Sequence, residues 1–341
     1  MLLEGRAKQT FDWFRKRSLE LETEFKEKGG LPNHEVWRAQ YYRNPYLLLE
    51  TDQTILDRFA DIFTNTIDIS TDGKITPTPM MEQGMRLSRF FTEIIEETNW
   101  RAILHKDSMQ PAFRQVHAYY ENGEPAGVKM FKTLPLKQDN YLYKFSKKEF
   151  VREMHDFGRF RICPASFYSK GSHIHAVKDF ETIRQYRLKA IKEVSEGLGS
   201  IEYGGHQIDI VNGVVPVQCV LDDYYLFSTC NELSRRMPTD FESDAVLIIK
   251  NKKEFISRLK DELQISFPDW EFVEKDVYYY DSYNDIPKDP NQEFFKHIAY
   301  AYQKEHRSIV RPRLAKNENY ELQPIYIEMG ALHDICEVIY A

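Results

Sequence analysis

The stretch Ile298–Arg313, IAYAYQKEHRSIVRPR, places charged side chains inside an otherwise apolar segment and constrains the fold more than any other part of the sequence. In an extended chain, residues two apart share a face, so Gln303, Glu305 and Arg307 would point the same way. The β-branched pair that follows favours a strand closed by Pro312. The pattern therefore predicts a strand inside a domain, with a carboxylate between an amide and a guanidinium. Glu305 is the leading catalytic candidate.

The composition is that of a soluble, intracellular protein. The chain has 341 residues, enough for two domains, and an apolar share of 42% that can build real cores. Its net charge of −7 argues against a broad basic surface for nucleic acid. The N-terminus carries charge where a signal peptide needs an apolar core, and no window approaches the length of a membrane span. We therefore expect a cytoplasmic protein with no membrane partner.

The four cysteines and the absence of common motifs narrow the chemistry. The cysteines lie far apart without a C-x-x-C pair, which argues against a zinc ribbon or a disulfide framework. The sequence also contains no P-loop, G-x-G-x-x-G, H-E-x-x-H or G-x-S-x-G motif. P-loop ATPases, Rossmann dinucleotide folds, zincins and nucleophile-elbow hydrolases therefore have no support.

Residues 1–135 are predicted to form a mostly helical N-terminal domain that binds a target or a partner. Apolar residues recur at helical spacing over 6–28, over 80–100 and after Thr51, which is placed to cap a helix. Residues 70–79 are rich in residues that interrupt helices and strands, which predicts a loop. Aromatic side chains at helical spacing usually build a core, so we expect no chemistry in this domain.

Residues 136–341 are predicted to form an α+β domain with a mixed or antiparallel sheet and flanking helices. A strand YLYKF is followed by a helix, with Ser146 as its cap and Gly158 as its stop, and by the strand RFRICPASFY. A helix is expected over 179–196, and residues 289–302 are helix-like. Most of the remaining segments have the composition of strands. Because helices and strands do not alternate regularly, a parallel α/β fold is not expected.

The order of three pieces, YLYKF…GRFRICPASFY, FSTC and QKEHR, resembles the ADP-ribosyltransferase superfamily, and its toxin branch in particular. Members carry an Arg or His on an early strand, a Ser-Thr-Ser strand in the middle and a Q-x-E or E-x-E motif near the end. The resemblance covers roughly residues 139–341. The sequences of these segments are also similar to those of bacterial proteins associated with abortive infection and phage defence. The resemblance to the superfamily implies an ADP-ribosyltransferase-like domain that uses NAD as a substrate.

The resemblance implies catalytic roles for Glu305, Ser228 and Gln303. Glu305 would accept a hydrogen bond from the ribose and stabilise positive charge in an oxocarbenium-like transition state. Ser228 would orient Glu305 or the ribose, although the third residue of its element is Cys230 where the family has Ser. Gln303 would meet the acceptor, which is a protein or a nucleic acid.

It also implies a set of residues that bind NAD. The early basic position falls on Lys144 if YLYKF is the first strand and on Arg161 if RFRIC is, with Arg159 as a third choice. The cation at this position, Lys144 or Arg161, would hold the diphosphate. Tyr168 or Phe167 would stack on nicotinamide. The remaining members of this set are Thr229 and Arg307.

Each of these residues also has a plainer explanation. Glu305 and Arg307 can form a simple ion pair, and Ser228 can end its strand through bonds to the backbone. Arg161 can pair with Asp179 or Glu181, which follow the same loop. Under that explanation the chain is a non-catalytic binding or regulatory protein of the same fold.

A third hypothesis is a metal-dependent nuclease built on the H-x-H pair His173 and His175 with nearby acids. No third ligand at a recognisable spacing supports it, so we expect no metal. The leading hypothesis remains a toxin-type ADP-ribosyltransferase in anti-phage defence or a toxin–antitoxin system. Such an enzyme needs restraint, which implies an antitoxin or chaperone as a further partner.

Overall fold

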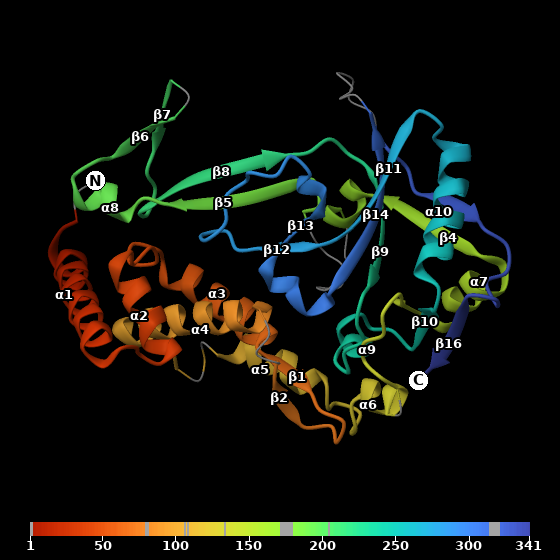
Figure 1. Ribbon diagram of the computed structural model, residues 1–341, viewed down its shortest axis with the longest axis horizontal. Helices are drawn as coiled ribbons and strands as arrows, with labels where there is room; N and C mark the ends of the chain where they lie inside the picture. Colours follow the sequence, from red (N-terminus) through yellow and green to blue (C-terminus); the bar gives the residue numbers. More distant parts are fainter. Residues whose placement is uncertain are drawn as a thin grey trace.

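The computed structural model combines a helical part and a sheet part, drawn in Figure 1. The predicted α+β class is confirmed, because the sheets pair antiparallel apart from one short parallel pair. The residues that the structure describes are 3–78, 82–105, 107, 109–132, 134–170, 180–203, 205–313 and 321–341. Within them, no helix is long and apolar enough to cross a membrane.

The helical part begins at the N-terminus, and local signals set its boundaries. Thr51 caps α3 by accepting a hydrogen bond from the Thr54 amide at 3.1 Å, as its position predicted. Gly29 ends α1 with a left-handed φ of 70°. The helices of this part are α1 (Gly5–Lys28), α2 (Asn33–Arg43), α3 (Asp52–Asn65), α4 (Glu82–Arg101), α5 (Gln110–Ala118) and α6 (Ala126–Phe131). The predicted loop over 70–79 contains β2 (Ile75–Pro77), which pairs with β1 (Ile67–Ile69).

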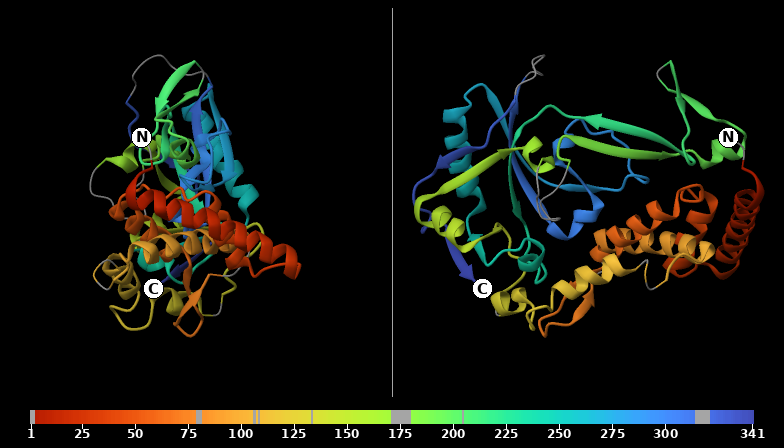
Figure 2. Two further views of the ribbon diagram at one scale, coloured as in Figure 1. Left: turned by 90° about the vertical axis from the view of Figure 1, so that its left-hand side faces the viewer. Right: turned by 180° about the vertical axis from the view of Figure 1, so that it is seen from behind.

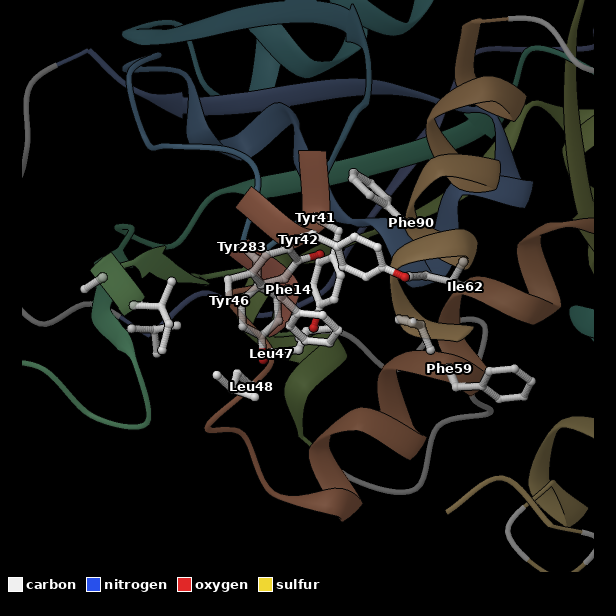
Figure 3. Close-up of a cluster of buried hydrophobic side chains, with 14 of the residues drawn as sticks. Phe14, Tyr41, Tyr42, Tyr46, Leu47, Leu48, Phe59, Ile62, Phe90 and Tyr283 are labelled. Carbon is white, nitrogen blue, oxygen red and sulfur yellow. The ribbon is translucent and has the colours of Figure 1, made fainter. Parts of the chain in front are cut away.

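An aromatic core joins the helices to segments from much later in the chain (Figure 3). Phe14 of α1 stacks on Tyr42 of α2 with ring centroids 4.8 Å apart. Phe59 of α3 and Phe90 of α4 are buried in the same cluster, and so is Tyr283. The helices therefore pack on the second half of the chain through a shared apolar core.

The main sheet holds the strands that the motifs predicted. Its order is β11-β14-β9-β3-β10-β16, and β4 pairs with both β9 and β15. Its strands are β3 (Leu142–Ser146), β4 (Arg159–Pro164), β9 (Tyr225–Cys230), β10 (Ala245–Ile249), β11 (Trp270–Asp276), β14 (Glu305–Pro312), β15 (Ile325–Glu328) and β16 (Cys336–Tyr340).

Along one edge, β9 pairs with two different strands, so the sheet divides there. At the end of β9, Cys230 pairs with Tyr143 of β3. At its beginning, Leu226 pairs with Cys163 of β4. Residues 227–229 lie between these two pairings, so this stretch of backbone faces a gap between β3 and β4. The gap positions the candidate site described below.

Helices α7 (Lys148–Phe157) and α10 (Lys252–Ser266) cover the sheet with apolar side chains such as Val151 and Phe255. Asn251 caps α10 as predicted, accepting a bond from the Glu254 amide at 3.1 Å. Ser146 does not cap α7, contrary to expectation, since it is the last residue of β3 and Lys147 precedes the helix. The Lys148 amide donates to Asp244 Oδ1 at 2.6 Å.

The predicted helix over 179–196 is wrong over most of its described length, and only Ile191–Ser195 is helical. Residues Ile183–Lys189 form β5, which pairs along its whole length with β8 (Val214–Val220). This strand pair reaches from the sheet over the helical part, as the right view of Figure 2 shows. The remaining elements are α8 (Ile191–Ser195), β6 (Ser200–Tyr203), β7 (His206–Asp209), α9 (Met237–Asp240), β12 (Tyr278–Tyr280), β13 (Phe295–His297) and three short 3₁₀ helices, Ala165–Ser169, Gln292–Phe294 and Ile298–Gln303.

Candidate functional site

Glu305 is a buried carboxylate held by donors from three different elements. It begins β14 and is 4% exposed. The Ser228 hydroxyl donates to its Oε1 at 2.5 Å, and Arg307 Nε donates to the same oxygen at 2.8 Å. Lys296 Nζ donates to Oε2 at 2.9 Å. The carboxylate therefore has a fixed orientation.

The pairing of β14 with β9 brings these side chains together. Arg307 lies opposite Ser228, and Glu305 lies opposite Cys230. Because alternate residues of a strand share a face, all four side chains project from the same side of the sheet. The motifs FSTC and QKEHR thus meet as neighbours, although they lie 77 positions apart at Ser228 and Glu305.

Gln303 does not lie on the strand that the alternation predicted. It ends the 3₁₀ helix Ile298–Gln303, and Lys304 turns the backbone with a left-handed φ of 47° before β14 begins. Lys296 Nζ nevertheless donates to Gln303 Oε1 at 2.9 Å as well as to Glu305. The amide and the carboxylate are therefore joined by a lysine rather than by strand geometry. The helix-like segment before them is not an α-helix, because β13 pairs there with β12.

A second buried carboxylate, Glu181, completes a network that the sequence reasoning missed. Arg307 Nη2 donates to Glu181 Oε1 at 2.6 Å, and Arg184 Nη2 to Oε2 at 3.2 Å. Lys296 Nζ lies 3.7 Å from Glu181 Oε1. We call the set Glu181, Arg184, Lys296, Glu305 and Arg307 the ion network.

The ion network keeps both carboxylates ionised. Burial raises the pKa of Glu305, but the charges of Arg307 and Lys296 and the bonds from Arg307 and Ser228 outweigh it. The pKa of Glu305 therefore lies well below its ordinary value. The pKa of Glu181 is lowered in the same way, since Arg307, Lys296 and Arg184 outweigh its burial.

Glu305 lines a cavity of about 170 Å³ where the sheet divides, which we call the site cavity. Its walls come from β3, β9, the 3₁₀ helix after β4 and the segment around β13. The lining residues are Tyr143, Lys144, Phe145, Tyr168, Glu181, Leu226, Ser228, Thr229, Cys230, Phe241, Lys296, Gln303 and Glu305. The predicted catalytic residues thus share one cavity with Lys144, Tyr168 and Thr229 from the predicted cofactor set.

Lys144 is the early basic residue that reaches the site cavity. Its Nζ donates to the Ser228 carbonyl at 2.7 Å, which lies in the gap between β3 and β4. The ammonium also lies 4.9 Å from the centroid of the Phe227 ring. Burial lowers the pKa of Lys144, partly offset by Cys230 and Glu305. Lys144 is the predicted cation that lies among the residues lining the site cavity.

The other predicted cations lie elsewhere. Arg161 is exposed, and its guanidinium lies 4.7 Å from the Phe167 ring centroid rather than in the cavity wall. Arg159 is exposed and pairs with Glu153 at 2.9 Å and with Glu328 at 3.1 Å. The pairing of Arg161 with Glu181 is not seen, because Glu181 binds the ion network. Neither arginine brings its charge to the site cavity.

Arg307 lies behind the site cavity instead of in its wall. It is 0% exposed, and besides the two carboxylates it donates to the Glu293 carbonyl at 2.6 Å. It holds Glu305 through its Nε and is not among the residues that line the site cavity. Outside the described residues lie His173, His175 and Asp179.

A larger cavity, of about 840 Å³, lies between α3 and the β5–β8 strand pair. The larger cavity and the site cavity lie on opposite sides of β13. His297 lines the larger cavity, and its neighbour Lys296 lines the site cavity. Two cations in the wall of the larger cavity are already paired, Arg58 with Asp281 and Arg187 with Glu50. We place the candidate site at the smaller cavity because the motif residues converge there.

Searches against models of protein families, curated proteins and solved structures found no match for this chain. The geometry of the site therefore stands without a relative to compare it with.

The low pKa of Glu305 predicts how stability depends on pH. In the unfolded chain this carboxyl titrates near 4.5, and in the folded protein it titrates lower. Its contribution to stability is therefore fully present above pH 4.5 and is lost as the pH falls towards the folded pKa. The free energy of unfolding, measured with urea between about pH 7 and about pH 3, should be higher for the parent than for Glu305→Gln. This difference should shrink only at the acidic end. A constant difference across that range would contradict the ionised, paired state.

Proposed function

We propose that this chain is an ADP-ribosyltransferase that transfers ADP-ribose from NAD to a macromolecular acceptor, and that residues 136–341 form its catalytic domain. The observation that carries the proposal is the convergence of Ser228, Glu305, Gln303 and Lys144 on one cavity. They come from β9, β14, a 3₁₀ helix and β3, so three motifs that are distant in sequence supply one site.

The state of Glu305 suits this chemistry. Breaking the bond between nicotinamide and ribose C1′ leaves the electron pair on nicotinamide and positive charge on the ribose. A carboxylate that stays ionised and needs no proton transfer stabilises that charge. Glu305 accepts three donors at present, and a carboxylate has about four lone-pair sites, so it has room for one ribose hydroxyl. The acceptor nucleophile then bonds to C1′ and releases its proton to solvent, while neutral nicotinamide leaves.

The size of the site cavity limits which part of NAD it encloses. Its volume of about 170 Å³ is below the roughly 300–1,000 Å³ of pockets that enclose a whole ligand. We infer that the nicotinamide end enters, against Tyr168, while the adenosine end lies outside. In this proposal Lys144 binds the diphosphate and Gln303 meets the acceptor, since both line the site cavity.

The resemblance noted in the sequence extends the proposal to biology. We propose that the acceptor is a protein or a nucleic acid of the cell, that the enzyme acts in the cytoplasm as a toxin in anti-phage defence, and that an antitoxin or chaperone restrains it. The helical part, joined to the sheet part through the aromatic core, is the proposed surface for such a partner.

NAD labelled in its nicotinamide and adenylate halves tests the activity. We expect the purified protein to release labelled nicotinamide and to transfer the adenylate label to macromolecules of a cell extract. Nicotinamide release without transfer would indicate NAD hydrolysis with no suitable acceptor. If neither product forms with any acceptor supplied, the chain is a binding protein that lacks turnover, and the proposal fails.

A further inference from the structure

Two histidines and one aspartate converge on the outer side of the sheet part, and none of them lines the site cavity. His155 lies in the last turn of α7, Asp156 follows it, and His333 lies in the turn before β16. His155 Nδ1 is 2.9 Å from Asp156 Oδ1, and His333 Nε2 is 3.1 Å from the same oxygen. We call these residues the His–Asp cluster.

All three potential ligand atoms lie within 4.8 Å of one another. Zinc bonds of about 2.0–2.1 Å in tetrahedral geometry separate neighbouring ligand atoms by about 3.3 Å. The two measured separations of 2.9 and 3.1 Å are therefore close to those of a loaded site. Small rotations of side chains that are partly or largely exposed would open the space for an ion.

The backbone that carries the cluster is held in place. The Leu332 amide donates to the His155 carbonyl at 2.9 Å, which ties the turn before β16 directly to α7. Leu332 is fully buried, and Asp334 pairs with Arg258 of α10. The cluster is thus assembled before any ligand arrives, which reduces the entropy cost of binding.

One contact shows how closely the two segments approach. A Cβ on Gly158 would lie 2.2 Å from the Gly330 carbonyl oxygen, and the Met329 amide donates to the Gly158 carbonyl at 3.0 Å. Gly158 also has a left-handed φ of 64°. The end of α7 therefore accepts only glycine here, and this close approach brings His333 within reach of His155.

We propose that the His–Asp cluster binds one Zn²⁺ ion through His155 Nδ1, His333 Nε2 and an oxygen of Asp156. Two imidazoles and a carboxylate are a ligand set that zinc takes, and the fourth position is open to water. The ion ties the end of α7 to the turn before β16. Because α7 packs on β10, β16, β4 and β3, zinc stabilises the sheet that carries Lys144.

Calorimetric titration of the metal-free full chain with Zn²⁺ alone tests this site. We expect one ion per chain and a higher melting temperature when it is bound. His333→Ala should weaken binding by more than the roughly 10- to 100-fold that losing a supporting partner costs at metal sites. Asp156→Asn, which keeps an oxygen ligand but removes its charge, should weaken binding less. X-ray absorption of the zinc complex should show two imidazole ligands.

Two control variants test whether histidines outside the His–Asp cluster bind the zinc. His34→Ala removes an exposed histidine of α2, and His175→Ala removes one of the H-x-H pair. Both should bind zinc like the parent. The proposal is overturned if His333→Ala, folded by circular dichroism without metal, binds zinc as tightly as the parent. It is equally overturned if His175→Ala abolishes binding, and the cluster is then a hydrogen-bonded trio only.

Discussion

Replacing Glu305 by glutamine should abolish most nicotinamide release from NAD, lowering the turnover rate by about 10²–10³-fold, the cost of losing one preorganised electrostatic group. Glutamine keeps the shape of the side chain and an oxygen for Ser228, but it removes the negative charge that faces the ribose. Release of labelled nicotinamide at saturating NAD measures this loss directly.

Glu328→Gln is the matched control for this substitution. Glu328 lies on β15 and forms a surface pair with Arg159 at 3.1 Å, which contributes little to stability or chemistry. It should release nicotinamide at the parental rate. A Glu305→Gln protein as active as this control would remove Glu305 from the mechanism.

Replacing Arg307 by methionine should destabilise the fold by about 3–5 kcal/mol, the usual cost of breaking a buried ion pair by removing one partner. Arg307 is fully buried and bonds to both carboxylates of the ion network, at 2.8 Å to Glu305 and 2.6 Å to Glu181. Its loss leaves two buried negative charges without their common guanidinium. Urea unfolding at neutral pH measures the difference.

Two further variants identify the cause of that destabilisation. Arg311→Met removes an arginine of the same strand that is partly exposed and pairs with the exposed Glu271 and the partly buried Glu293, so it should cost only about 1 kcal/mol. Adding Glu181→Gln to Arg307→Met should restore part of the stability, because it removes one of the unpaired carboxylates. Equal stability of the Arg307→Met and Arg311→Met proteins would contradict the ion network.

Several features of the fold that depend on neighbouring residues could be predicted from the sequence, although the Ser146 cap could not. Thr51 and Asn251 cap helices because a side-chain oxygen three positions before an amide needs no distant partner. The shared face of Glu305 and Arg307 follows from strand alternation alone. The order of the motifs indicated Ser228 as the third member of this group.

The parts that depend on distant pairing could not be predicted. Ile183, Tyr186 and Ala190 have helical spacing, yet the segment forms a strand because β8 supplies a partner along its whole length. Lys296 contacts Glu305 from β13, and Glu181 is joined to Glu305 through Arg307; no local pattern marks either residue. The left-handed turn at Lys304 ends a 3₁₀ helix that strand alternation does not predict, and this turn takes Gln303 off the strand.

The central claim is that the site cavity receives the nicotinamide end of NAD beside Glu305. A crystal structure of the Glu305→Gln protein soaked with NAD tests it most directly, because the uncleaved substrate should accumulate. The account predicts nicotinamide against Tyr168, the ribose between Ser228 and position 305, and the diphosphate at Lys144. An empty site cavity at saturating NAD, or NAD bound only in the larger cavity beside α3, would contradict it.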